Sequence, residues 1–297
     1  MIQTRGERVF TLFSAIMMGL IALAAFLPFI LIVISSVTKE SSLINDGYSF
    51  FPKAFSMDAY IYLEASAYTF LRAYGVSFLV TIVGTAVGLL ITSMLAYPMS
   101  RRDFKYHNLL AFAVFFTMLF SGGVVPSYIM WTQYFHIKDS LAALIVPNLL
   151  ANGFNVLLVR NYFKSNVPLD LIESAQIDGA TETKTFFRIM LPLSVPVLAT
   201  VGLFMGLAYW NDWINALYFV SKPQFYGIQN LLVQLMNNIQ YLNSGQAGNA
   251  VGAGAVDLPS SAVRMAMAVL GIVPILVVLP PLQKFLTRGV VIGAVKG

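Results

Sequence analysis

The stretch "ESAQIDGATETKTFFRIMLPLSVP", from Glu173 to Pro196, places a cluster of charged residues in a strongly apolar chain. The 297 residues are 58% hydrophobic and only 10% charged, and the mean hydropathy is +0.76. Soluble domains carry about 25% charged residues, so the composition predicts an integral membrane protein. A charge costs about 2.5–3.5 kcal/mol at the centre of a membrane-spanning helix. We therefore expect this stretch to lie outside the bilayer.

Six apolar stretches are each long enough for a membrane-spanning helix, which needs about 20 mainly apolar residues. The predicted spans lie near residues 10–35, 72–97, 108–131, 141–160, 192–215 and 264–285. The first has a basic start, but its apolar run is longer than that of a cleaved signal peptide, so we expect it to be retained. The predicted fold class is all-α, a single integral membrane domain over residues 1–297.

Lysine and arginine collect in the cytoplasmic segments of membrane proteins. With the N-terminus inside, twelve of the 18 Lys and Arg residues fall in cytoplasmic segments and six in outer ones. Both termini and the polar segment 164–192 are thus predicted to be cytoplasmic, and the segment 218–262 extracytoplasmic. The same distribution accounts for the net charge of +5 without a nucleic-acid partner.

The outer segment contains a second pattern. In "IQNLLVQLMNNIQYL" (228–242), apolar residues recur at helical spacing and amides fill the other face, which predicts an amphipathic helix. The stretch 243–261 that follows is rich in Gly and small residues and is predicted to be a loop. Two G-x-x-x-G pairs, Gly84 with Gly88 and Gly202 with Gly206, favour close packing of helices.

Several kinds of chemistry are not expected in this chain. It has no cysteine, and His107 and His136 are isolated from any carboxylate pattern, so no metal site is predicted. It also lacks the G-x-x-x-x-G-K-[ST] loop that binds nucleotide phosphates. We therefore expect no cofactor, no ATP binding and no catalysis in this chain.

The opening stretch has the local signals of two short helices. Residues 170–177 can form two turns of helix, Asp178-Gly179 is a turn signal, and Thr181 can cap a second helix that ends near Arg188. Such a structured polar segment on the membrane face is suited to docking a soluble partner. An ordinary cytoplasmic loop remains the alternative on composition alone.

The spacing resembles that of a loop in ABC importer permeases, in which E-A-A-x-x-x-G is followed after nine residues by I-x-L-P. Here Glu173, Gly179 and Ile189 hold the three key positions, and Ser174 replaces the first alanine. Three other stretches resemble the carbohydrate-uptake branch, the relatives of the maltose permease subunits, and its oligosaccharide sub-branch: "YWNDWINAL" (209–217), "FLTRGVVIGAVKG" (285–297) and "FSGGVVPSY" (120–128).

The resemblance implies a type I ABC importer permease fold, with six spans and a cytoplasmic coupling helix that docks to a separate ATPase. In family terms Glu173 helps to anchor the loop, Gly179 makes the turn, and Ala175 and Ala180 face the partner. The full set of residues implied in coupling is Glu173, Ser174, Ala175, Asp178, Gly179, Ala180, Ile189, Leu191 and Pro192.

The resemblance also implies partners. These are a second, different permease subunit, a dimer of ABC ATPase subunits that binds ATP and Mg, an extracytoplasmic solute-binding protein and a carbohydrate substrate, all at a bacterial-type cytoplasmic membrane. The sequence does not name the sugar. In the family the 218–262 region meets the binding protein, and the helix 228–242 is expected to lie on the membrane or brace an outer gate.

Candidate pathway residues follow from the family, in which the fourth and fifth spans help to line the cavity. Three asparagines share one face of a predicted helix at i, i+4 and i+7, and the end of the fifth span is rich in polar and aromatic residues. Interhelical hydrogen bonding and an interfacial aromatic belt are the alternatives. The predicted pathway residues are Asn148, Asn152, Asn155, Trp210, Asn211, Asp212 and Asn215.

Three other functions are the alternatives to a permease subunit. A secondary transporter or channel would need ionisable groups at mid-membrane or internal repeats, and an intramembrane enzyme would need a catalytic constellation within the spans. Neither pattern is evident in the sequence. A structural membrane subunit would leave uptake intact when deleted. A secondary transporter or channel also leaves the spacing from Glu173 to Pro192 unexplained.

Overall fold

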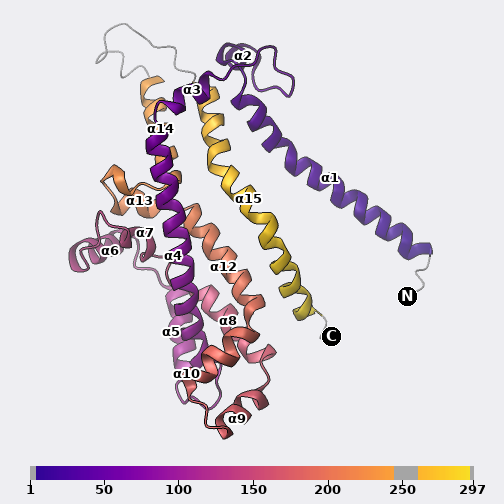
Figure 1. Cartoon of the computed structure of the whole chain (residues 1–297), viewed down its shortest axis with the longest axis vertical. Helices are drawn as coiled ribbons and strands as arrows, with labels where there is room; N and C mark the ends of the chain where they lie inside the picture. The colour runs from indigo at the N-terminus through magenta and orange to yellow at the C-terminus, as the bar shows by residue number, and fades with distance from the viewer. Residues whose placement is uncertain (1–4, 244–259, 295–297) are drawn as a thin grey trace. The chain divides into compact units, whose positions relative to one another are not determined.

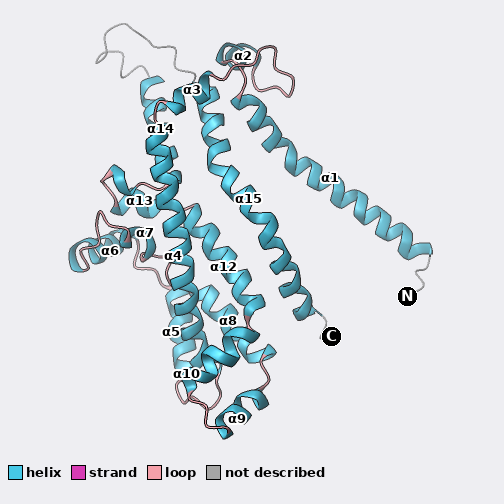
Figure 2. Cartoon of the chain, in the orientation of Figure 1, coloured by secondary structure: helices cyan, strands magenta, loops and turns pink. Residues whose placement is uncertain are grey.

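A computed structural model describes residues 5–243 and 260–294, which are helical and contain no β-strand (Figure 2). The chain divides into two compact units, one of Met1–Tyr68 with Gln234–Ile275 and one of Thr69–Val233 with Leu276–Gly297. An all-α architecture satisfies the backbone groups within each helix, except in its first and last turns, as an apolar environment requires.

The first unit is built around long apolar helices (Figure 1). Its elements are α1 (Arg5–Ser36), α2 (Glu40–Asp46), α3 (Asp58–Glu64), the later part of α14 (Ile228–Asn243) and the first part of α15 (Ser260–Ala294). The Glu40 carboxylate accepts hydrogen bonds from the backbone N–H groups of Ser261 and Ala262, at 2.9 and 2.8 Å. It thereby satisfies two donors that the first turn of α15 leaves open.

The second unit contains the remaining helices. In chain order these are α4 (Ala67–Ser100), α5 (His107–Leu119), α6 (Val124–Ile129), the π-helical turn η1 (Met130–Tyr134), α7 (Ala142–Ile145), α8 (Gly153–Asn166), α9 (Leu169–Ile177), α10 (Glu182–Thr185), the π-helical turn η2 (Phe186–Met190), α11 (Leu191–Leu193), α12 (Val195–Trp210), α13 (Ile214–Phe219) and the 3₁₀ turn η3 (Pro223–Phe225). Helix α8 contacts both α5 and α12.

The main core of this unit joins α4, α8 and α12 to the polar segment that follows α8. Its buried members are Ala96, Met99, Val156, Val159, Phe163, Val167, Ile172, Phe186, Met190, Val197, Val201 and Met205. A contiguous apolar cluster of this kind is the main favourable term in holding the elements together. The segment is therefore packed onto the helices and is part of one folded unit with them.

Close packing of α4 on α12 depends on glycines. A Cβ atom at Gly84 would lie 2.5 Å from Cζ of Tyr209, and one at Gly88 would overlap Cε of Met205. Both positions are far inside van der Waals contact, so the side chains of α12 occupy the space that these glycines leave. The predicted packing role of the first G-x-x-x-G pair agrees with this geometry.

The prediction that residues 141–160 form one continuous helix is wrong. Helix α7 has only four residues, and α8 begins at Gly153. Between them the backbone of Asn148 has φ of +63°, the left-handed region that ends a helix. Asn152 then caps α8, because its side-chain oxygen accepts from the backbone N–H groups of Phe154 and Asn155.

Two other predicted spans are bent. Helix α5 and the α6–η1 segment meet at 113°, with Gly123 at φ of +83° in the break, and the segment before α12 meets α12 at 80°. Within the described residues, three helices are long and apolar enough to cross a membrane, or up to five if each bent pair counts as one span. These three are Arg8–Ser36, Ala67–Ser100 and Ser261–Val278.

The predicted amphipathic helix is confirmed as α14. In the part of α14 that belongs to the second unit, Ile228, Leu231 and Leu232 are buried, and the N–H of Ile228 donates to Oγ of Ser77 at 2.8 Å. In the first unit Ile239 is buried, while the neighbouring amides are exposed. The stretch predicted to be a loop, 243–261, lies almost wholly in 244–259, outside the described residues.

We expect Gly84→Ala to destabilise the protein by about 1–3 kcal/mol, because the new methyl group would overlap the Tyr209 ring. Gly75→Ala, on the same helix, is the matched control: a Cβ added there would meet no neighbouring side chain or other helix within 4 Å, so it should be neutral or stabilising by up to about 1 kcal/mol. Thermal unfolding of the purified protein in detergent measures both. Equal stabilities for the two variants would contradict this packing.

Candidate functional site

The polar segment folds as its sequence predicts. Helix α9 ends at Ile177, Gly179 takes φ of +74°, and its N–H donates to the carbonyl of Gln176 at 3.0 Å. A glycine suits this left-handed position because it has no Cβ to clash with the backbone. Oγ1 of Thr181 then accepts from the N–H of Lys184 and caps α10. The predicted helix, turn and cap are all confirmed; we call residues 169–193 the docking loop (Figure 1).

One face of the docking loop is packed against its own chain. Ile172 of α9 and Phe186 and Met190 of η2 belong to the main core with Met99 of α4. Ala175 is only 9% exposed, so its methyl group faces this chain and leaves little surface for a partner. This differs from the role that the family resemblance implied for Ala175.

The opposite face of the docking loop is open. Ile177 is 87% exposed, and Asp178 and Gly179 beside it are exposed as well. Glu173 and Ser174, one turn earlier on α9, are also exposed, while Ala180 is half-buried. At the far end of the loop Ile189 and Leu191 are half-buried and Pro192 is exposed. Ile177, at the tip of the turn, is the most exposed large apolar side chain of the loop.

A polar cluster that the sequence did not predict links the docking loop to α4. Both carboxylate oxygens of Glu182 are engaged: Oε2 accepts from the Tyr97 hydroxyl at 2.5 Å, and Oε1 accepts from Nε2 of Gln176 at 3.0 Å. Nη2 of Arg101 lies 3.5 Å from Oε1 of the same group. No sequence motif marks Tyr97, Arg101 and Glu182, because the contact joins positions more than 80 residues apart.

Arg101 is the buried charge of this cluster. The residue is 6% exposed, and its Nε and Nη2 donate to the two oxygens of Asp103, at 2.8 and 2.5 Å. Hydrogen bonding to Asp103 raises the pKa of Arg101, and hydrogen bonding from Arg101 lowers the pKa of Asp103 below its ordinary value of 3.8. Both side chains are therefore charged throughout the neutral range.

The three asparagines predicted to share one helix face do not do so. Asn148 lies in the left-handed turn after α7, Asn152 is the cap of α8, and only Asn155 is inside that helix, where it is buried. The prediction is wrong because it assumed a continuous helix, whereas the Asn148 turn interrupts the periodicity.

The polar residues after α12 hold a corner of the chain together. Oδ1 of Asp212 accepts from the backbone N–H groups of Ile214 and Asn215 and so caps α13. The buried Asn215 amide donates to the carbonyl of Pro147 at 2.9 Å, and Nδ2 of Asn211 donates back to its own helix at Leu207. Only the Asn215 bond joins distant parts of the chain; those of Asp212 and Asn211 are local.

The two tryptophans at this corner differ in their exposure. Trp210 is buried, and its ring packs against Tyr74 and Phe78 of α4, with ring centroids 6.4 and 5.1 Å away. Trp213 is exposed. Burial of the Trp210 ring within its own chain makes it part of the packing between α4 and α12.

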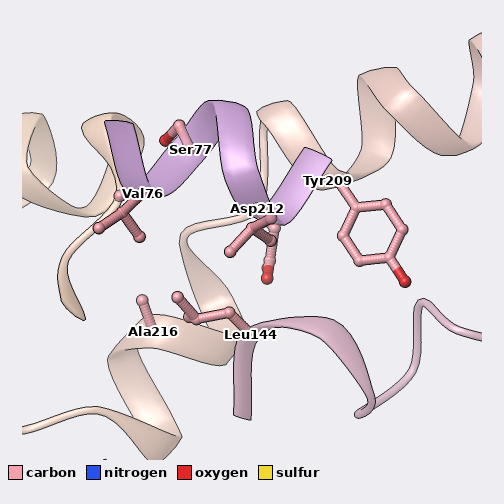
Figure 3. Close-up of a pocket in the computed structure, with 8 residues that line it drawn as sticks. Val76, Ser77, Leu144, Tyr209, Asp212 and Ala216 are labelled. Atoms are coloured by element: carbon pink, nitrogen blue, oxygen red, sulfur yellow. The ribbon is translucent and has the colours of Figure 1, made fainter. Parts of the chain in front are cut away.

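A small cavity lies beside Asp212 (Figure 3). It is lined by Val76, Ser77, Val80, Leu144, Tyr209, Asp212, Ala216 and Gly227. About 10 Å³ is accessible to the centre of a water molecule, which is room for one water. In this conformation the cavity cannot take a sugar ring.

Long apolar helices joined by a structured polar loop are typical of an integral membrane protein. Over residues 4–292 the chain matches the family "Binding-protein-dependent transport system inner membrane component". The chain belongs to this family and is a permease component of an ABC transport system. Members are membrane permease subunits, which implies no catalysis in this chain and, in general, a partner permease, an ATPase and a solute-binding protein.

The chain is similar to known permeases over its whole length. It is 39% identical to "Protein LplC" of Bacillus subtilis (strain 168), with 99% of this chain and 97% of the relative aligned. It is 37% identical to "Polygalacturonan/rhamnogalacturonan transport system permease protein YtcP" of the same organism, with 93% and 94% aligned.

A solved structure shows the same fold. It is a chain of a bacterial ABC transporter involved in the import of the acidic polysaccharide alginate. The TM-score is 0.78 at 24% identity, with 96% of this chain and 99% of that chain covered. The chain therefore has the type I ABC permease fold.

We expect Asp212→Asn to retain transport, because an asparagine oxygen can accept the same two backbone hydrogen bonds, and Asn and Asp are comparable N-caps. Asp212→Ala should lose about 1 kcal/mol of stability through the missing cap. Uptake by cells and the melting temperature in detergent measure the two effects. A transport-dead but fully stable Asp212→Asn variant would show that the carboxylate contacts substrate.

The Arg101–Asp103 pair makes the stability of the folded protein depend on pH. Because the folded-state pKa of Asp103 is lowered, its contribution to stability is present above the ordinary pKa and is lost as pH falls through the folded-state value. We expect this contribution to be constant between about pH 5 and 8 and to fall away below about pH 4. Asp103→Asn should flatten the acid part of a melting-temperature profile. An unchanged acid profile in that variant would exclude the pair as its source.

Proposed function

We propose that this chain forms half of the translocation pathway of an ATP-driven oligosaccharide importer, with a second, different permease subunit as the other half. Family membership over residues 4–292 supports the permease role. The relatives include permeases for polygalacturonan/rhamnogalacturonan and for arabinooligosaccharides, which favours an oligosaccharide as the cargo.

The open face of the docking loop is the proposed contact with the ATPase subunit. The observation that carries this assignment is Ile177, exposed beside the Gly179 turn while the other face of α9 is packed into the core. ATP binding closes the two ATPase subunits, and the docking loops move with them. Because the loop shares a core with α4, α8 and α12, its movement changes the access of the pathway from one side of the membrane to the other.

We further propose six membrane crossings with both termini in the cytoplasm. Helices α1, α4, α12 and α15 supply four, the bent α5–α6–η1 segment supplies one, and α7 with α8 supplies the sixth as a broken span. Broken helices are tolerated in membranes where the freed backbone groups find partners within the protein. The carbonyls of Ile145 and Pro147 do so, because they accept from Tyr209 and Asn215. The excess of Lys and Arg on the inner side supports the orientation.

Substrate contact is proposed for the chain around the α7–α8 break and the end of α12. Asn148 and Asn211 are exposed there, whereas Asp212 holds the start of α13. Asn152, Asn155, Trp210 and Asn215 hold these segments in place by capping and packing. Amides and aromatic rings of this kind supply the hydrogen bonds and apolar faces that carbohydrates need.

Site-specific cross-linking tests the docking assignment. The chain has no cysteine, so Ile177→Cys introduces a single thiol at the exposed tip of the loop. We expect it to form a disulfide with a cysteine placed along the cleft of the co-expressed ATPase, with a yield that changes on adding ATP. Ser165→Cys, at an exposed position on α8, is the matched control and should react with a water-soluble maleimide without cross-linking.

The same experiment can also contradict the docking assignment. If Ile177→Cys reacts freely with maleimide in the assembled complex and never cross-links, the docking assignment fails. The ATPase subunit would then have to contact another segment of the chain.

A further inference from the structure

We propose that Glu182, Tyr97 and Arg101 form the link that fixes the docking loop to α4 and so transmits its movement to the membrane helices. The inference rests on the proposed function, because the movement originates at the ATPase. In this assignment Glu182 is a positioning residue: it contacts neither cargo nor nucleotide and acts through the elements that it joins.

Three elements converge on one carboxylate. Glu182 stands in the first turn of α10, Gln176 in the last turns of α9, and Tyr97 in the last turn of α4. Their hydrogen bonds to Glu182 fix both helices of the docking loop to the same end of α4. The neighbouring turn of α4 is held a second time, because Nε of Arg160 on α8 donates to the carbonyl of Met99 at 3.0 Å.

The buried guanidinium of Arg101 lies at the centre of this group of hydrogen bonds. Nη1 of Arg101 donates to the Tyr97 hydroxyl at 3.2 Å, while the Tyr97 hydroxyl donates to Glu182. The guanidinium carbon also lies 5.8 Å from the centroid of the Tyr97 ring. A buried charge is costly unless it is bonded on several sides, and Asp103 supplies the remaining partner. Arg101 is thus held in one orientation, and it presents a fixed donor set to the loop.

Apolar packing is not the only restraint on the loop. The contacts of Ile172, Phe186 and Met190 hold it against the core. Hydrogen bonds depend on both distance and angle, so those to Glu182 add a directional restraint between the loop and α4. The junction therefore converts a displacement of the loop into a displacement of α4.

The effect of Glu182 on stability can be measured separately from its effect on the position of the loop. Its side chain is 60% exposed, whereas that of Arg101 is 7% exposed and keeps the Asp103 pair when Glu182 is removed. Exposed ion pairs contribute little to stability. Removal of Glu182 should therefore leave the protein folded and able to dock, and should affect the transmission of movement.

The test uses the complete transporter in proteoliposomes, with its ATPase and binding protein, and the Ile177→Cys chain as parent. We expect Glu182→Ala to keep the parent's melting temperature and cross-link yield but to lower cargo transported per ATP hydrolysed by about fivefold or more. Tyr97→Phe, which removes only the hydroxyl, should lower the ratio in the same direction. Asp46→Ala, which breaks the exposed Lys53–Asp46 pair outside the loop, should leave the ratio unchanged.

Three other outcomes are possible, and each contradicts a particular proposal. An unchanged ratio in Glu182→Ala overturns this proposal and leaves the docking assignment standing. A lost cross-link in Glu182→Ala, with the melting temperature kept, also overturns it, because Glu182 would then belong to the docking surface itself. An absent cross-link in the parent overturns the proposed function, and this proposal with it.

Discussion

The shared core of the docking loop and the helices α4, α8 and α12 is the constraint on which the rest of the structure depends. A polar segment that must reach a soluble partner cannot enter the bilayer, yet it has to be mechanically joined to helices that do. The chain meets both needs by alternating faces: Ile172, Phe186 and Met190 point into the core, and Glu173, Ile177 and Asp178 point outward. The hydrophobic effect then holds the loop in place, while its outer surface keeps its polar character.

The features that were predictable from sequence are those in which neighbouring residues determine the geometry. Gly179 and Thr181 fix the turn and the cap of the docking loop through bonds to residues at most three positions away. The amphipathic helix α14 follows from a period that needs no knowledge of its partners. The G-x-x-x-G pair on α4 is a third case, because a missing side chain permits close approach whichever helix arrives.

The features that were missed depend on contacts between distant parts of the chain. The apolar stretch from 141 to 160 is long enough for a helix, but the carbonyls of Ile145 and Pro147 are satisfied from α12 and α13, by Tyr209 and Asn215. Those partners let the helix break at Asn148 without leaving the two carbonyls unbonded. In the same way nothing near Tyr97 and Arg101 in the sequence indicates that Glu182 lies beside them. A tertiary partner therefore overrides local propensity in one place and creates a polar cluster in the other.

Asp212 and Glu182 show why a carboxylate in an apolar chain does not by itself identify a substrate site. Oδ1 of Asp212 accepts two backbone N–H groups of the turn that follows it, so its bonds are local and serve to start α13. Glu182 accepts from side chains on two other helices, so its bonds are long-range and relate whole elements to one another. A carboxylate with local bonds can be replaced by any good cap. A carboxylate with bonds to other helices fixes their positions relative to one another. In a protein whose parts must move together, the second kind is where a carboxylate matters for mechanism even though it touches no ligand.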